Sequence, residues 1–119
     1  MTRQTRIAAR LRAVLATATL SATLVAPPAS FAQPAGQQYT VTINNMAYGA
    51  TPDGAKVGDS VIWVNRDSVP HSVTARDHSF DIRLNPGQQA KMTLGSPGRI
   101  AFYCLFHPSM RGSLAVAPK

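Results

Sequence analysis

The sequence predicts an all-β fold, a β-sandwich of about seven to eight short antiparallel strands. Several short segments alternate apolar and polar residues with a period of two. Glycine, proline and asparagine separate these segments at intervals of roughly 8 to 12 residues. No stretch has the apolar spacing of a sustained helix, and no internal repeat is present. The order of the strands within the sheets does not follow from this pattern.

The first half of the fold is expected to hold three strands. Residues 39–44 alternate strictly and predict a half-buried strand. Residues 46–54 contain two glycines and a proline, so they predict a turn-rich connection. Residues 60–65 include four consecutive apolar side chains, which predicts a strand covered on both faces. The third strand, residues 71–75, begins at His71 directly after a proline.

The second half continues the same alternation. Residues 80–84 predict another strand, and residues 88–94 are expected to pair back with it beyond an Asn-Pro-Gly turn. Residues 99–104 predict a strand whose alternation places the only cysteine, Cys104, on the same face as two apolar core residues. Residues 113–116 predict the last strand. The cysteine therefore points inward at the end of its strand.

Residues 1–32 have the composition of a cleaved secretory signal peptide. The first 12 residues hold four arginines and no acid, residues 13–25 are mostly apolar, and residues 26–32 are rich in small residues and proline. A membrane anchor needs about 18 to 20 apolar residues, whereas hydroxyl side chains interrupt this shorter run. We expect cleavage after Ala32 and export to the periplasm, without stable membrane insertion.

Charge and cysteine count narrow the function of the remaining domain, residues 33–119. The full chain carries a formal net charge of +7, but four of its 12 bases belong to the predicted signal; eight bases and five acids remain, a net +3. The basic excess is therefore no argument for nucleic-acid binding. The length allows one domain, expected to be monomeric. Its single cysteine cannot form an internal disulfide, and a metal ligand is the simplest explanation for an unpaired thiol in an exported protein.

A soft donor set lies near the C-terminus. Cys104, His107 and Met110 follow one another at the spacing C-x-x-H-x-x-M, on the loop between the last two predicted strands. A thiolate, an imidazole and a thioether together suit copper better than a hard cation. We expect His71, which follows Pro70 at a strand start, to supply a second imidazole. Three strong ligands with a weak axial thioether are the donor set of a blue-copper site.

Other interpretations of these residues are weaker. Taken singly, a lone cysteine is commonly an inert core residue, a histidine beside proline a surface residue, and a methionine a core filler. Structural zinc usually takes four strong ligands. A catalytic Cys–His pair would need an oriented base and an oxyanion site, and covalent haem would need C-x-x-C-H. We therefore expect no enzyme, and an ordinary turn residue at His78.

Residues 63–71 and 103–112 resemble the cupredoxin family of type 1 blue-copper proteins, most closely its amicyanin, plastocyanin and pseudoazurin-like members. The resemblance covers essentially all of residues 33–119. It implies a Greek-key β-sandwich, one copper ion, and one-electron transfer between periplasmic redox proteins such as a c-type cytochrome or a dehydrogenase, by transient docking. The four positions that the resemblance assigns to the metal are His71, Cys104, His107 and Met110.

The alternative to an electron carrier is a periplasmic copper-binding or sequestering protein without a shuttle role. The chain offers no extra methionine or histidine clusters of the kind expected for copper handling, so electron transfer is favoured.

Two departures from the family pattern concern the cysteine loop. The asparagine usual after the first histidine is Ser72 here, and the serine or threonine usual after the cysteine is Leu105. We therefore expect the hydrogen-bonded tether between these positions to be missing, which would affect the reduction potential. An apolar patch of Pro70, Phe106 and Pro108 is expected to dock redox partners, although an aromatic residue serves as core filler equally often.

Overall fold

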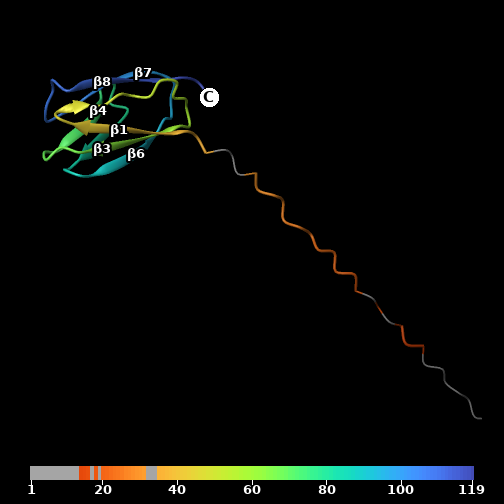
Figure 1. Ribbon diagram of the computed structural model, residues 1–119. Coiled ribbons are helices and arrows are strands. Elements are labelled where there is room, and N and C mark those ends of the chain that lie inside the picture. Colours follow the sequence, from red (N-terminus) through yellow and green to blue (C-terminus); the bar gives the residue numbers. More distant parts are fainter. Residues whose placement is uncertain (1–13, 17, 19, 32–34) are drawn as a thin grey trace, which may run out of the picture. The chain divides into compact units, whose positions relative to one another are not determined.

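The computed structural model describes residues 14–16, 18, 20–31 and 35–119 (Figure 1). The chain divides into two units, Met1–Phe31 and Ala32–Lys119. In the first unit the described residues belong to no helix or strand. The basic start of the predicted signal and its predicted cleavage site after Ala32 lie outside the described residues. Within the described ranges, no helix has the length and hydropathy needed to cross a membrane.

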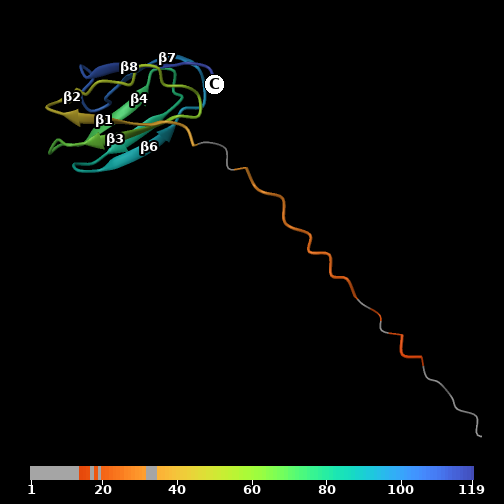
Figure 2. The same cartoon turned by 45° about the vertical axis from the view of Figure 1, so that its right-hand side comes forward.

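The second unit is a sandwich of two four-stranded sheets, layered one over the other (Figures 1 and 2). One sheet has the strand order β2-β1-β3-β6, the other β5-β4-β7-β8, and residues 35–119 contain no helix. The predicted all-β sandwich is confirmed. In chain order the strands are β1 (Gln38–Asn44), β2 (Ala47–Tyr48), β3 (Ser60–Asn65), β4 (His71–Ala75), β5 (Asp81–Leu84), β6 (Gln89–Thr93), β7 (Gly98–Tyr103) and β8 (Arg111–Val116).

One strand pair departs from the antiparallel prediction. β1 and β3 run parallel, in a register from Gln38 opposite Ser60 to Ile43 opposite Asn65. The connection between them contains the short strand β2 and then returns along the molecule, so β3 starts at the same end as β1. The other pairs within the two sheets are antiparallel. The predicted pairing of residues 88–94 with residues 80–84 is wrong, because β6 pairs with β3 in one sheet and β5 with β4 in the other.

The central strand β3 is covered less fully than its sequence predicts. Val61 and Trp63 are completely buried between the sheets, but Ile62 and Val64 on the opposite face are only half-buried. Ile62 lies opposite Lys91 of β6 on this outer face. The expectation of a strand covered on both faces is therefore wrong, because side chains of neighbouring strands shield the outer face only in part.

Three aromatic rings anchor the core beneath one end of the sandwich. Phe102 packs edge to face on Trp63 and on Tyr48, with ring centroids 5.2 and 4.9 Å apart. Gly112 lies opposite Phe102 on β8, and a Cβ atom at this position would collide with the Phe102 ring. Each fully buried large side chain contributes about 1.5 to 3 kcal/mol. This packing fixes the end of β7, which directly precedes Cys104.

The sheet order brings two distant segments to the same end of the molecule. β4 pairs antiparallel with β7, so the start of β4, at His71, lies next to the end of β7, at Tyr103. The loop from Cys104 to Met110 then leads into β8. The fold itself therefore places His71 close to the cysteine loop.

Candidate metal centre

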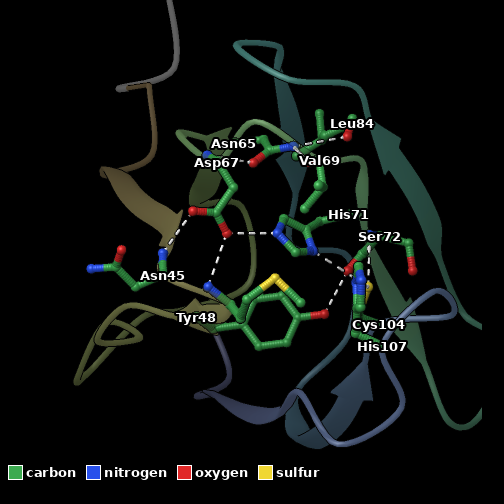
Figure 3. Close-up of polar contacts among 11 residues, drawn as sticks. Asn45, Tyr48, Asn65, Asp67, Val69, His71, Ser72, Leu84, Cys104 and His107 are labelled. Carbon is green, nitrogen blue, oxygen red and sulfur yellow. Dashed lines mark hydrogen bonds and ion pairs between the residues drawn. The ribbon is translucent and has the colours of Figure 1, made fainter.

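Three predicted donor atoms converge at this end of the sandwich. The Cys104 Sγ lies 3.8 Å from Nδ1 of His71 and 3.8 Å from Nδ1 of His107. All three atoms lie within 4.8 Å of one another (Figure 3). His71 and Cys104 are fully buried, whereas His107 is half-buried. The structure thus brings together three of the four side chains that the sequence nominates.

Met110 closes the same loop. Its amide donates a hydrogen bond to the His107 carbonyl at 2.9 Å, and its own carbonyl accepts one from the Cys104 amide at 3.1 Å. Its side chain is 5% exposed and joins the hydrophobic core. Burial is common to a core methionine and to an axial thioether ligand. The loop is compact, because backbone hydrogen bonds link both of its ends.

A carboxylate that sequence reasoning missed binds the far side of His71. Asp67 Oδ2 lies 2.7 Å from His71 Nε2, and the two Asp67 oxygens also accept the amides of Asn45 and Met46 at 2.7 and 2.9 Å (Figure 3). The Met46 amide, followed by the His71 side chain, lowers the pKa of Asp67. The carboxylate holds the proton on Nε2, which leaves Nδ1 directed at the cysteine sulfur. The sequence signal that could have indicated this contact is an aspartate four residues before the histidine.

The side chain of Asn65 holds the loop that carries Asp67 in place. Fully buried Asn65 accepts the Asp67 amide on Oδ1 at 2.9 Å, while its Nδ2 donates to the carbonyls of Val69 and Leu84 at 2.8 and 3.1 Å. On the facing loop, Asn45 has a left-handed backbone (φ 53°), as does its successor, and both amides point at the carboxylate. Asp67 is therefore positioned before any metal arrives.

Ser72 supports the cysteine loop in two ways. Its amide donates to Cys104 Sγ at 3.3 Å (Figure 3), and its hydroxyl accepts the Leu105 amide at 2.8 Å. The predicted loss of the tether is therefore wrong. The donor is a backbone N–H, which is present whatever the side chain at position 105, so leucine there does not remove the hydrogen bond. The serine side chain is long enough for its oxygen to reach this amide.

Tyr48 of β2 is a further neighbour that sequence reasoning missed. Its hydroxyl donates to the Ser72 carbonyl (Figure 3). Burial, and then negative charge on Cys104, raise the pKa of Tyr48. The phenol therefore stays a neutral donor and binds the same residue that contacts the cysteine sulfur.

Comparison with known proteins gives a consistent result. The model of the Cupredoxin-like domain family matches residues 12–116. The chain belongs to this family. Among curated relatives, amicyanin of Paracoccus denitrificans is 30% identical over 95 residues, covering 75% of this chain and 72% of the relative. Amicyanin of Paracoccus versutus is 28% identical with the same coverage.

Solved amicyanin structures share the fold of this cupredoxin. A Cu(I) form of a methionine-to-glutamine variant superposes with a TM-score of 0.60 at 28% identity, over 66% of this chain and 81% of that one. A reduced Cu(I) form of a proline-to-glycine variant at pH 4 gives 0.57 at 32% identity, over 71% and 84%. The copper in both cases belongs to amicyanin.

The donor set of this cupredoxin fits a single type 1 copper ion. Metal-to-nitrogen and metal-to-thiolate bonds of about 2.0 and 2.3 Å, at 120° to each other, set nitrogen and sulfur roughly 3.7 Å apart. The 3.8 Å separations of Sγ from both Nδ1 atoms match this spacing. The distance of the sulfur from each imidazole nitrogen therefore suits a common metal ion, and two imidazoles with one thiolate are the equatorial set of type 1 copper.

The remaining residues of the sequence prediction are the three of the apolar patch and His78, and all of them are exposed. Pro70, Phe106 and Pro108 are exposed around the metal end, and the Phe106 side chain is 47% exposed. The core-filler interpretation of Phe106 is therefore wrong. His78 lies in the turn between β4 and β5 with a left-handed backbone (φ 64°), and the donor cluster does not include it. An ordinary turn residue was the expectation.

Proposed function

We propose that this cupredoxin is a periplasmic type 1 blue-copper protein that carries single electrons between redox partners. His71, Cys104 and His107 are the equatorial ligands in this proposal, and Met110 is the axial one. The observation that carries it is the convergence of one thiol sulfur and two Nδ1 atoms within 4.8 Å at one end of the sandwich. The similarity to amicyanin supports the electron-carrier role, and the predicted signal in residues 1–32 supports export.

The fixed part of the site keeps its geometry during electron transfer. A type 1 copper ion supplies one-electron chemistry by alternating between Cu(I) and Cu(II). Cys104 and His71 stand at paired strand ends, and both are fully buried. The Ser72 amide donates to Cys104 Sγ at 3.3 Å and helps to fix the position of the sulfur. Donors on rigid strands move little, so little reorganisation accompanies each transfer.

The exposed part of the site provides access. His107 is half-buried on the loop, and the neighbouring Leu105 and Phe106 side chains are 36% and 47% exposed. With Pro70 and Pro108, these apolar side chains form a docking patch for a c-type cytochrome or a dehydrogenase. Redox encounters use small, weak interfaces so that partners separate quickly after transfer. The ring of His107 is then the ligand nearest to a docked partner.

The visible spectrum of the copper-loaded protein tests the proposal. The wild type is expected to show the intense blue charge-transfer band of a copper–thiolate bond. Cys104→Ser is expected to abolish this colour while leaving the far-UV circular dichroism unchanged, because serine fills nearly the same buried space. A Cys104→Ser protein that stays blue would refute the ligand assignment.

Met110→Gln tests the axial position. An amide oxygen in place of the thioether is expected to keep the blue colour but shift the reduction potential, because the axial ligand tunes it. Met92→Gln in β6, on the other sheet, is the matched control and is expected to leave the potential unchanged. Equal potentials for Met110→Gln and wild type would remove Met110 from the ligand set.

A further inference from the structure

The hydroxyl of Ser72 does not act alone. Ser72 Oγ lies 2.9 Å from Thr74 Oγ1, and Thr74 Oγ1 donates to Asp81 Oδ1 at 2.9 Å. Together with the Leu105 amide, which donates to Ser72 Oγ at 2.8 Å, these contacts form an unbroken chain from the cysteine loop to a carboxylate. The chain starts at the peptide bond that follows Cys104.

The direction of every hydrogen bond in this chain is fixed by chemistry. A carboxylate only accepts, so the Thr74 hydroxyl proton points to Asp81. The Thr74 oxygen is then free to accept the Ser72 proton, and the Ser72 oxygen accepts the Leu105 amide. The pKa of Asp81 is lowered, with the Thr74 hydrogen bond as the largest cause, which agrees with this orientation.

The sheet sets the position of each member. Ser72 and Thr74 are two apart on β4 and share a face, and Asp81 of β5 stands opposite Thr74 in register. Ser72 is fully buried and Thr74 is 7% exposed, whereas the Asp81 side chain is 43% exposed. Arg83, which follows on β5, holds the second Asp81 oxygen at 3.1 Å. The chain thus runs from the metal end, along one sheet face, to the protein surface.

A serine alone would hold the loop poorly. A serine side chain rotates among three staggered positions about its Cα–Cβ bond, and in two of them its oxygen points away from a given partner. The donation to Thr74 selects the orientation in which the Ser72 oxygen faces the Leu105 amide. Successive hydrogen bonds also polarise one another, so an ionised end group strengthens the whole chain.

We propose that Thr74 and Asp81 are positioning residues that act through Ser72 to hold the Cys104–Leu105 peptide in place, so that a surface carboxylate helps to set the reduction potential of the site. The part about the reduction potential rests on the proposed copper function. The part about the loop does not, because every contact involved is a contact of this chain alone.

Amide exchange of Leu105 in the metal-free protein tests the loop directly. Thr74→Val keeps the shape but removes the link, and it is expected to speed Leu105 exchange about tenfold, the equivalent of roughly one net hydrogen bond. Thr74→Ser restores a hydroxyl and is expected to return the exchange rate to within about twofold of wild type. A Thr74→Val protein that exchanges at the wild-type rate would overturn the relay.

Charge variants separate the relay from general electrostatics. Asp81→Asn weakens the end of the chain and is expected to speed Leu105 exchange about threefold. Asp77→Asn removes the same charge in the adjoining turn, where its carboxylate binds the amide and hydroxyl of Ser79, and it is expected to leave the exchange rate unchanged. Equal effects of the two variants would assign the change to charge and overturn the relay.

The copper-loaded protein gives the second readout. Thr74→Val, which changes no charge, is expected to shift the reduction potential and the blue band, and Thr74→Ser to restore both. If the wild type takes up no blue copper, the proposed function fails, while the exchange measurements on the metal-free protein still decide the relay. If the wild type is blue and Thr74→Val alters exchange but neither potential nor band, the link between relay and potential is refuted.

Discussion

The two histidines of the site are held in opposite ways. His71 is fully buried at the start of a strand, and its Nε2 forms a hydrogen bond with the Asp67 carboxylate at 2.7 Å. His107 is half-buried on a loop, and among residues 35–119 its ring has one hydrogen-bond partner, the Cys104 sulfur at 3.8 Å. The two rings meet edge to face, with centroids 5.1 Å apart. Two identical side chains therefore give the site one fixed side and one open side.

This difference separates two requirements of an electron carrier. A site built on strands keeps its geometry better than a site built on loops, and the fixed side combines strand β4 with the Asp67 and Asn65 contacts. Contact with a partner instead requires a donor near the surface, which the loop supplies through His107. Each requirement is met by a different histidine, so each can be altered independently.

The largest expected effect comes from removing each ring in turn. His71→Gly leaves a buried cavity and an Asp67 carboxylate without its partner, so the metal-free protein is expected to lose roughly 3 kcal/mol of unfolding free energy. His107→Gly opens onto solvent and is expected to cost about 1 kcal/mol or less. Added imidazole should restore the blue colour only in His107→Gly, because only that gap is open to solvent.

His78→Gly is the control for this pair. Its backbone is left-handed at φ 64° and its side chain is exposed, so glycine fits without strain. Stability and copper binding should equal those of wild type. If added imidazole restores the blue colour equally in His71→Gly and His107→Gly, the site does not have one fixed and one open side.

A smaller effect is expected from Asp67→Asn, which weakens only the fixed side. Outer-shell partners of metal-bound histidines typically change metal affinity 10- to 100-fold, and we expect a loss of about tenfold in a chelator competition. The reduction potential should rise, because removal of a negative charge favours Cu(I). Asp77→Asn, remote from the donor cluster, serves as the charge control. An unchanged copper affinity in Asp67→Asn would show that the strand alone fixes His71.

The same variant should change acid stability. The pKa of Asp67 in the folded chain lies below its ordinary value. Its contribution is therefore fully present above the ordinary aspartate pKa of about 3.9 and is lost as the pH falls through the lowered folded value. In metal-free protein, wild type should lose stability more steeply than Asp67→Asn below about pH 4. Parallel acid unfolding curves would contradict this assignment.

The fixed and open sides also differed in how far sequence could describe them. Strand alternation placed Cys104 inward, and spacing along one loop nominated His107 and Met110, because both signals are local. The parallel pairing of β1 with β3 was missed, because it depends on how a long connection returns. Asp67 was missed because its contact with His71 needs a particular turn, which local alternation does not encode.

The support of the cysteine loop shows the same limit more sharply. The pair Ser72 and Leu105 indicated a lost tether when side chains were compared position by position. The contact instead uses a backbone amide, and the chain that orients Ser72 crosses from β4 to β5 through Thr74 and Asp81. Cross-strand register decides such a contact, and register was not readable from the sequence.

The smallest structural effect is expected from Phe106→Ala, which tests the open side alone. Phe106 is 47% exposed, so unfolding free energy should change by less than about 0.5 kcal/mol, and the reduction potential should stay the same. Electron self-exchange between Cu(I) and Cu(II) copies, measured by NMR line broadening, should slow about fivefold, because the encounter loses roughly 1 kcal/mol of apolar contact. The domain is expected to carry a net +3, so the measurement belongs at salt high enough to screen repulsion.

Ile62→Ala, on the outer face of β3, is the matched control for this measurement. It removes a half-buried apolar side chain from a face of the sandwich away from the donor cluster, so it should leave self-exchange unchanged even if it costs some stability. Slowing by Phe106→Ala but not by Ile62→Ala would locate the encounter at the His107 side. If electron self-exchange in both variants is as fast as in the wild type, electron transfer does not need the apolar patch. Exposure of the His107 ring is then sufficient for it.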